Sequence, residues 1–149
     1  MKEMNMGEAV KSVLSNYANF NGRARRSEYW WFYLAVILVT LVPTILLGIG
    51  SATAAAATVG GHGPAFPVIS VIGLVLLIPL TLALIIPSLA VAVRRLHDQG
   101  KSGAWWFIQF VPFIGTIWFI ILLATEGTRG PNQYGPDPKA YPASPPPVH

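Results

Sequence analysis

Three long runs of apolar residues limit what this chain can fold into more than any other feature. They are YWWFYLAVILVTLVPTILLGIG (29–50), VISVIGLVLLIPLTLALIIPSLAVAV (68–93) and AWWFIQFVPFIGTIWFIILLA (104–124), and none contains Lys, Arg, Asp or Glu. A helix of about 20 apolar residues crosses the roughly 30 Å of hydrocarbon in a bilayer. Only 11% of the 149 residues are charged, against about 25% in soluble domains. The sequence therefore predicts an all-α integral membrane protein with three apolar membrane segments in one membrane domain, residues 1–138.

Proline interrupts every run, at Pro43, at Pro79 and Pro87, and at Pro112. Membrane helices tolerate proline because neighbouring groups can satisfy the carbonyl that it frees, so we expect kinks in the helices. The third run has a second possibility, a re-entrant hairpin that turns at PFIG (112–115). Each half of that hairpin would be too short to cross the bilayer. Segment length therefore favours a single kinked crossing over the hairpin.

The ends of the chain differ from its middle. Apolar residues recur every three or four positions in MGEAVKSVLSNYANF (6–20), with polar residues between them, a spacing that predicts an amphipathic helix. Just before an apolar run, this helix is expected to lie in the membrane interface; the alternative is that it packs on the rest of the protein. Residues 139–149 are rich in proline and are predicted to form a disordered tail.

Basic residues indicate the orientation in the membrane, because cytoplasmic loops carry an excess of Lys and Arg. Five lie in segment 1–28, none in 51–67, three in 94–103 and two in the segment after residue 124. Three crossings with a cytoplasmic N terminus place eight inside and two outside, whereas a re-entrant third run places all ten inside. The N terminus is therefore predicted to be cytoplasmic, and the side of the C terminus depends on the third run.

Two charged motifs lie next to the apolar runs, GRARRSEYWWF (22–32) and RRLHDQGKSGAWW (94–106). Arg and Lys at the membrane surface attract anionic head groups, and Trp prefers the interface. Glu28 and Asp98 would be repelled by such lipids, so we expect cross-pairing: Glu28 with Arg94 or Arg95, and Asp98 with an arginine of 23–26. The candidate lipid- or anion-binding residues are Arg23, Arg25, Arg26, Arg94, Arg95 and Lys101, and the candidate interfacial aromatics are Trp30, Trp31, Trp105 and Trp106.

No pattern for catalysis or metal binding stands out. The chain has no cysteine, which excludes thiol chemistry and cysteine zinc sites. The three histidines, His62, His97 and His149, do not form a recognisable metal set with the acidic residues. We therefore expect no cofactor, no metal and no enzymatic activity; a head-group enzyme that uses His97 and Asp98 is the remote alternative. The basic residues lie beside membrane segments, so nucleic acid is not an expected partner.

Three motifs in order resemble a known family. FNGRARRSEYWWF (20–32), RRLHDQGKSGAWW (94–106) and GTRGPNQYGPDP (127–138) are similar to the YhaH-like bacterial inner-membrane proteins, a domain of unknown function (805). The resemblance implies an inner-membrane protein and supplies no reaction, substrate or cofactor. If the third motif joins the other two, it must be cytoplasmic and the third apolar run must double back.

The function expected from these features is non-enzymatic. The cytoplasmic Arg/Asp/Trp face is predicted to bind anionic phospholipid or a protein partner. The alternative is a subunit of an oligomeric transporter or channel, since three short segments alone make a poor conduit; a homo-oligomer or another membrane protein is then the expected partner.

Overall fold

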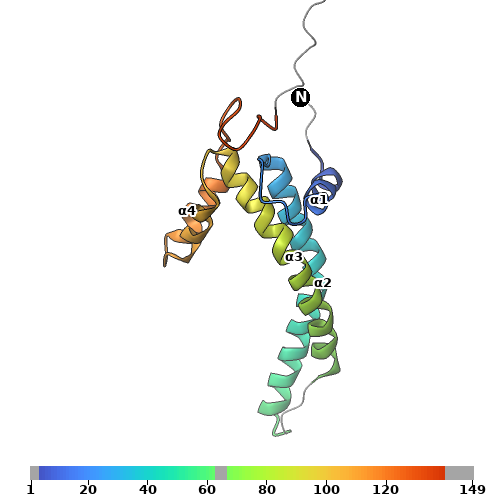
Figure 1. Cartoon of the computed structure of the whole chain (residues 1–149). Helices are drawn as coiled ribbons and strands as arrows, with labels where there is room; N and C mark the ends of the chain where they lie inside the picture. The colour runs from blue at the N-terminus through green and yellow to red at the C-terminus, as the bar shows by residue number, and fades with distance from the viewer. Residues whose placement is uncertain (1–3, 63–66, 140–149) are drawn as a thin grey trace, which may run out of the picture. The chain divides into compact units, whose positions relative to one another are not determined.

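The computed structural model describes residues 4–62 and 67–139, and its regular structure is helical (Figure 1). The elements are α1 (Met6–Ser15), α2 (Arg26–Val59), α3 (Val68–Asp98), the 3₁₀ helix η1 (Gly103–Phe110) and α4 (Gly115–Ala124). Within the described residues there is no strand, only an isolated bridge between Asn132 and Gly135. The predicted all-α class is confirmed. The predicted tail lies outside the described residues from residue 140 onward.

Two helices in the described part of the chain are long and apolar enough to cross a membrane, α2 with 34 residues and α3 with 31. At about 1.5 Å per residue both exceed a hydrocarbon core of about 30 Å. Both continue through their prolines. The expected loop over 51–67 is shorter than predicted, because α2 continues to Val59. Residues 52–57 are mostly alanine, the strongest helix former, which explains the extension.

The chain divides into two compact units. We call Tyr33–Ile86 the apolar unit and residues 1–32 with 87–149 the charged unit, because every Lys, Arg, Asp and Glu falls in the second. In the apolar unit, a Cβ on Gly73 of α3 would lie 2.8 Å from the backbone nitrogen of Leu47 in α2, so the helices pack closely there. Val42, Val75 and Leu82 are more than 60% exposed, as suits a surface that faces lipid.

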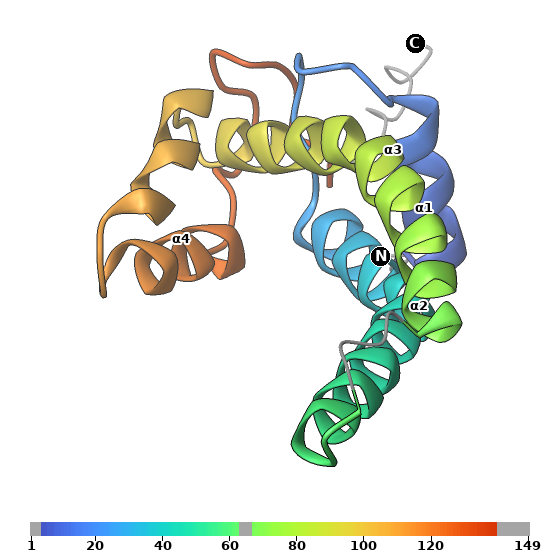
Figure 2. The same ribbon diagram turned by 90° about the horizontal axis from the view of Figure 1, so that it is seen from below.

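The third apolar run belongs to the charged unit and is not one helix. The favoured prediction of a single kinked crossing is not met: η1 and α4 lie side by side as a hairpin that turns at 111–114 (Figure 2). Pro112 lies in the turn, and Phe113 has a φ of 67°, which a helix cannot contain. A Cβ on Gly115 would lie 2.1 Å from the carbonyl oxygen of Ile108. Glycine at this position therefore allows α4 to start directly against η1.

Helix α1 starts with a reciprocal capping box. The side chain of Asn5 accepts from the backbone N–H of Glu8 at 2.9 Å, and the Glu8 carboxylate accepts from that of Asn5 at 3.2 Å, which satisfies two free donors. The helix ends at Ser15, five residues before the predicted end. Ala9 and Val13 are fully buried, so α1 packs on the rest of the charged unit, to which it belongs. Packing on the protein is the alternative that the sequence left open.

Candidate functional site

The three sequence motifs meet at the C-terminal end of α3. A Schellman motif ends this helix: Lys101 N–H donates to Leu96 and Gly100 N–H donates to His97, with Gly100 at a φ of +73° that glycine adopts readily. Segment 16–25 and the loop that follows α4 both run beside this end (Figure 2). The N-terminal motif (22–32), the central motif (94–106) and the C-terminal motif (127–138) therefore form one site.

Asp98, the last residue of α3, is the centre of this site. Its Oδ1 accepts from Nε of Arg23 at 3.0 Å and lies 2.9 Å from Nη2 of the same side chain. Its Oδ2 accepts from Nη1 of Arg95. Asp98 is 2% exposed and Arg95 is fully buried. Two guanidinium groups thus share one buried carboxylate, and further acceptors are needed to balance the second positive charge.

Backbone carbonyl oxygens supply these acceptors. Arg23 donates to the carbonyls of Gly130 at 2.6 Å and of Thr128. Arg95 donates to the carbonyl of Leu123 at 3.0 Å and to that of Thr125. The last carbonyls of a helix have no partner within it and favour a nearby cation, which is what Arg95 provides at the end of α4. The two arginines therefore fix both the hairpin and the C-terminal motif to α3.

Gly127 is required by the close approach of the C-terminal motif to Asp98. A Cβ at this position would lie 1.9 Å from Oδ2 of Asp98. The next residue, Thr128, donates its N–H to the Asp98 carbonyl at 2.7 Å. Backbone and carboxylate thus pack together without room for any side chain on residue 127.

A second buried pair joins α2, α3 and α1. Arg94 Nη1 donates to Oε1 of Glu28 at 3.1 Å, and the same oxygen accepts from Oγ of Ser12 at 2.9 Å. Arg94 and Glu28 are each 4% exposed. The Nε and Nη2 atoms of Arg94 have no hydrogen-bond partner among the described residues. Glu28 therefore holds α1 and the end of α3 against the start of α2.

His97 takes part in packing between motifs. Its ring stacks on Tyr134 with centroids 3.9 Å apart. Its Nδ1 lies 3.0 Å from the carbonyl oxygen of Gly22, and its own carbonyl accepts from Asn132 at 2.9 Å. His97 is only 9% exposed. The two residues considered for head-group chemistry, His97 and Asp98, therefore both lie buried within contacts between the three motifs.

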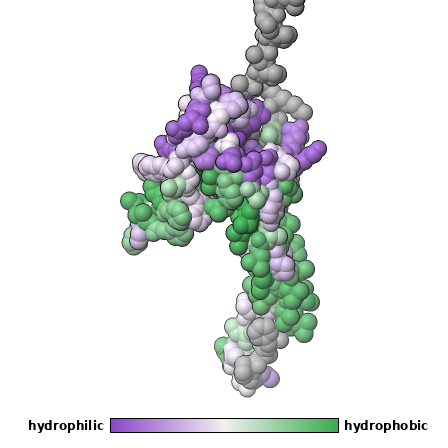
Figure 3. Space-filling view, in the orientation of Figure 1, coloured by the Kyte–Doolittle hydropathy of each residue, from purple (hydrophilic) through white to green (hydrophobic). Residues whose placement is uncertain are grey.

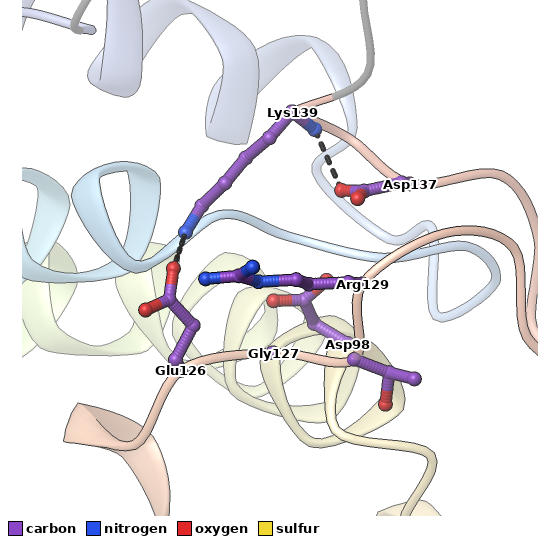
Figure 4. A pocket seen from close by; sticks show the side chains of 7 residues that line it. Asp98, Glu126, Gly127, Arg129, Asp137 and Lys139 are labelled. Atoms are coloured by element: carbon purple, nitrogen blue, oxygen red, sulfur yellow. Dashed lines mark hydrogen bonds and ion pairs between the residues drawn. The ribbon is translucent and has the colours of Figure 1, made fainter.

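A smaller set of charges lies at the edge of this network. Lys139 donates its ammonium to Glu126 at 2.7 Å and its backbone N–H to Asp137 at 2.9 Å, around a cavity of about 20 Å³ that Arg129 also lines (Figure 4). Hydrogen bonding from the Lys139 ammonium lowers the pKa of Glu126. The backbone N–H groups of Lys139 and Gly130 lower the pKa of Asp137. Among the described residues, no group of three metal-ligating side chains is present.

The six cations predicted to bind lipid separate into two groups. Arg23, Arg94 and Arg95 are buried and occupied by carboxylates and carbonyls. Arg25 and Lys101 are half-buried and Arg26 is exposed. Arg129, which is exposed in the C-terminal motif, was not among the predicted lipid-binding residues. The carbonyl acceptors were not predicted either, because backbone oxygens leave no residue-type signal; the glycine- and proline-rich pattern of 127–138 was the available hint.

The four predicted interfacial tryptophans divide in the same way. Trp30 and Trp106 pack on the core of the charged unit, while Trp31 and Trp105 are 39% and 42% exposed. That core consists of Ala92, Leu96, Phe119, Leu122 and Leu123. Within this unit, Figure 3 shows hydrophobic surface over the hairpin and hydrophilic surface over the loop that follows it. One tryptophan of each pair is therefore structural and the other is available to the surroundings.

Comparisons with known proteins cover most of the chain. A family model described as "Protein of unknown function (DUF805)" matches residues 17–136. Inner membrane protein YhaI of Escherichia coli K12 is 42% identical over 128 residues, which cover 86% of this chain and 92% of that protein. Inner membrane protein YhaH of the same strain is 39% identical over 131 residues, with coverage of 87% and 95%. Uncharacterized protein YiiR is 28% identical. No solved structure matches the chain.

Proposed function

This chain belongs to the DUF805 family, and its relatives YhaI and YhaH are inner membrane proteins of Escherichia coli; on that premise we propose a topology and a non-enzymatic function. Helices α2 and α3 cross the inner membrane, and both ends of the chain lie on the cytoplasmic side. The charged unit forms a cytoplasmic face that binds anionic phospholipid. Three crossings are not part of this proposal, because the third apolar run is a hairpin.

Helix lengths support two crossings. Helix η1 has 8 residues and α4 has 10, so at about 2.0 and 1.5 Å per residue each spans roughly 15 Å, half of the hydrocarbon thickness. The hairpin therefore enters and leaves on the same side. Phe110 and Phe113 near its turn are 67% and 97% exposed, which favours insertion into the cytoplasmic leaflet.

Charge supports the orientation. All ten Lys and Arg residues belong to the charged unit, and the apolar unit has none. With two crossings and a cytoplasmic N terminus, every basic residue lies on the cytoplasmic side. This agrees with the excess of Lys and Arg that cytoplasmic segments carry. Helix α1, with Lys11 on its exposed side, then lies at the cytoplasmic surface, close to the interface predicted for it.

A positive surplus supports binding of anionic lipid and is the observation that carries the proposal. The described part of the charged unit has nine basic and five acidic residues. All five carboxylates already accept hydrogen bonds from protein groups. Arg26 and Arg129 are exposed, with Trp31 also exposed. Each basic residue near an anionic surface contributes about 1 kcal/mol, so the surplus favours phosphatidylglycerol or cardiolipin over zwitterionic lipid.

Native mass spectrometry of the full-length protein in detergent tests this function. The protein is expected to retain phosphatidylglycerol in preference to phosphatidylcholine, and Arg26→Gln with Arg129→Gln should reduce that preference. Glu126→Gln is the matched control: it raises the positive surplus and should increase retention. Equal retention of the two lipids by the unmodified protein contradicts the proposal.

A further inference from the structure

A shallow groove lies at the start of η1 in the charged unit. Ser102, Ala104, Trp105 and Ile108 line it, and its volume is about 310 Å³. The backbone of η1 lies close to α3 beside it, since a Cβ on Gly103 would be 3.0 Å from Cγ1 of Val93. Apart from Ser102 the lining side chains are apolar or aromatic. The groove thus offers an apolar wall next to the polar turn after α3.

The turn after α3 places a cation at this groove. The Schellman motif at Gly100 reverses the chain directly before Lys101, whose ammonium lies 5.6 Å from the centroid of the Trp105 ring. Lys101 forms no salt bridge with a described carboxylate. The nearby acid of the central motif, Asp98, is buried and paired with Arg23 and Arg95. The positive charge of Lys101 is therefore available to an anionic ligand.

Ser102 adds a hydrogen-bond donor beside this cation. It stands at the N-cap position of η1 but makes no side-chain capping bond, and it is exposed. N-cap serines usually accept from the first turn of the helix. The Ser102 hydroxyl therefore does not cap η1. Ser102 lines the groove together with Trp105.

We propose that this groove binds one phospholipid of the cytoplasmic leaflet. This inference rests on the proposed function and names the site for it. The lipid phosphate lies against Lys101 and Ser102, and the glycerol and first methylenes lie along Trp105, Ala104 and Ile108. Tryptophan prefers this depth of the bilayer. An apolar wall offers free phosphate no hydrogen-bond partner, and the same helix, η1, also carries Phe107, which is 63% exposed. Both features favour a lipid as the occupant.

Four variants of the full-length protein test the site by native mass spectrometry with phosphatidylglycerol. Lys101→Gln removes the charge and should lower retention about fivefold, while Lys101→Arg should stay close to the unmodified protein. Ala104→Phe fills the groove at an exposed position and should also lower retention, although it changes no charge. Lys11→Gln removes an exposed cation on α1 that does not line the groove, and it is the matched control: retention should fall clearly less than for Lys101→Gln.

The outcomes separate this inference from the proposed function. If the unmodified protein prefers phosphatidylglycerol to phosphatidylcholine but Lys101→Gln and Ala104→Phe retain it normally, the groove is not the site and the lipid-binding face lies elsewhere on the charged unit. If Lys11→Gln lowers retention as much as Lys101→Gln, lipid is held by the overall surface charge and not by a defined site at the groove. If the unmodified protein has no preference, the proposed function itself is wrong. An unchanged midpoint of thermal unfolding for Lys101→Gln excludes misfolding as the cause of its effect, and normal retention by Lys101→Arg shows that the positive charge is what the site requires.

Discussion

At the scale of single residues, the fold of the charged unit depends on arginines that are buried. Arg95 is the largest of the fully buried side chains in the described part of the chain. Removing a charge from water costs several kcal/mol, and its partners must offset that cost. Asp98, Leu123 and Thr125 supply these partners. The network therefore fixes the positions of the segments that meet at Arg95, and the loss of any one acceptor leaves its buried charge only partly compensated.

Substitution of Asp98 measures this dependence. Asp98→Asn keeps the shape but leaves Arg23 and Arg95 without their shared carboxylate, so we expect a loss of about 3–5 kcal/mol in the free energy of unfolding. Thermal and denaturant unfolding in detergent measure it. The matched control is Glu126→Gln in an exposed pair, for which we expect little change in the free energy of unfolding because water and salt screen such pairs. Additive effects of Asp98→Asn and Arg23→Gln in a double-mutant cycle would show that the two side chains do not interact.

Substitution of Gly127 tests the close approach at the same site. Gly127→Ala places a Cβ 1.9 Å from Oδ2 of Asp98, so either the carboxylate or the loop must move and the Arg23 pair is disturbed. We expect a lower midpoint of thermal unfolding. Gly7→Ala in α1 is the control, since its Cβ would meet only Asn5 at an ordinary 3.5 Å and alanine favours a helix. Equal midpoints for the two variants would mean that the C-terminal motif does not pack on Asp98.

At the scale of elements, the two long helices could be predicted from the sequence, whereas the hairpin could not be distinguished from a single kinked crossing. Length and apolar composition sufficed for α2 and α3. The third run has the same composition, and its turn depends on a φ of 67° at Phe113 and on the contact of Gly115 with η1, neither of which a proline or a length count reveals. The three charged motifs gave the better indication, because they can meet only if the third run doubles back.

The site, like the helices, could be predicted from the sequence only in part. Isolated acids in a basic surface need partners, and this sufficed to suggest Arg94 or Arg95 for Glu28 and an arginine of 23–26 for Asp98. In the structure Glu28 pairs with Arg94, and Asp98 pairs with both Arg23 and Arg95. Burial of three of the six cations was not predicted. Arg23 donates to carbonyls of the C-terminal motif and Arg95 to carbonyls at the end of α4, while Arg94 is buried against Glu28. Backbone acceptors carry no residue-type signal, so only the structure separates the structural arginines from the available ones.

The C-terminal loop is expected to loosen in acid. Asp137 accepts from the N–H groups of Gly130 and Lys139, which lowers its pKa in the folded protein. Its contribution to stability is therefore fully present above the unfolded value of about 3.9 and is lost as the pH falls through the folded pKa. The rate of amide hydrogen exchange at residues 130 and 139, corrected for the pH dependence of the intrinsic exchange rate, should increase in that pH range. Asp137→Asn should remove most of this pH dependence; an unchanged profile in the variant would assign it to another group.

At the scale of the whole molecule, the distribution of charge between the two units matters most. The apolar unit contains no Lys, Arg, Asp or Glu, and the charged unit contains all sixteen, ten basic and six acidic. In the proposed topology, a hairpin in place of a third crossing brings Arg129 and Lys139 to the same side of the membrane as the other basic residues. The buried network requires this as well, because Arg23 reaches Thr128 and Gly130, which lie on the far side of the third apolar run in sequence.

Cysteine labelling tests the resulting topology. The chain has no cysteine of its own, so single cysteines at Ser15, Thr58 and Gln133, all exposed, report without background. In intact spheroplasts an impermeant thiol reagent should label Thr58→Cys only, because in the proposed topology α2 and α3 cross once each and the hairpin returns the chain to the cytoplasm. After permeabilisation all three should react, which controls for accessibility.

Labelling of Gln133→Cys in intact spheroplasts would show that the third run crosses the membrane, and the carbonyls that hold Arg23 would then lie on the opposite side of the bilayer from it. Because one chain cannot satisfy both arrangements, that single result decides between the two-crossing protein with its buried arginine network and a three-crossing protein without it.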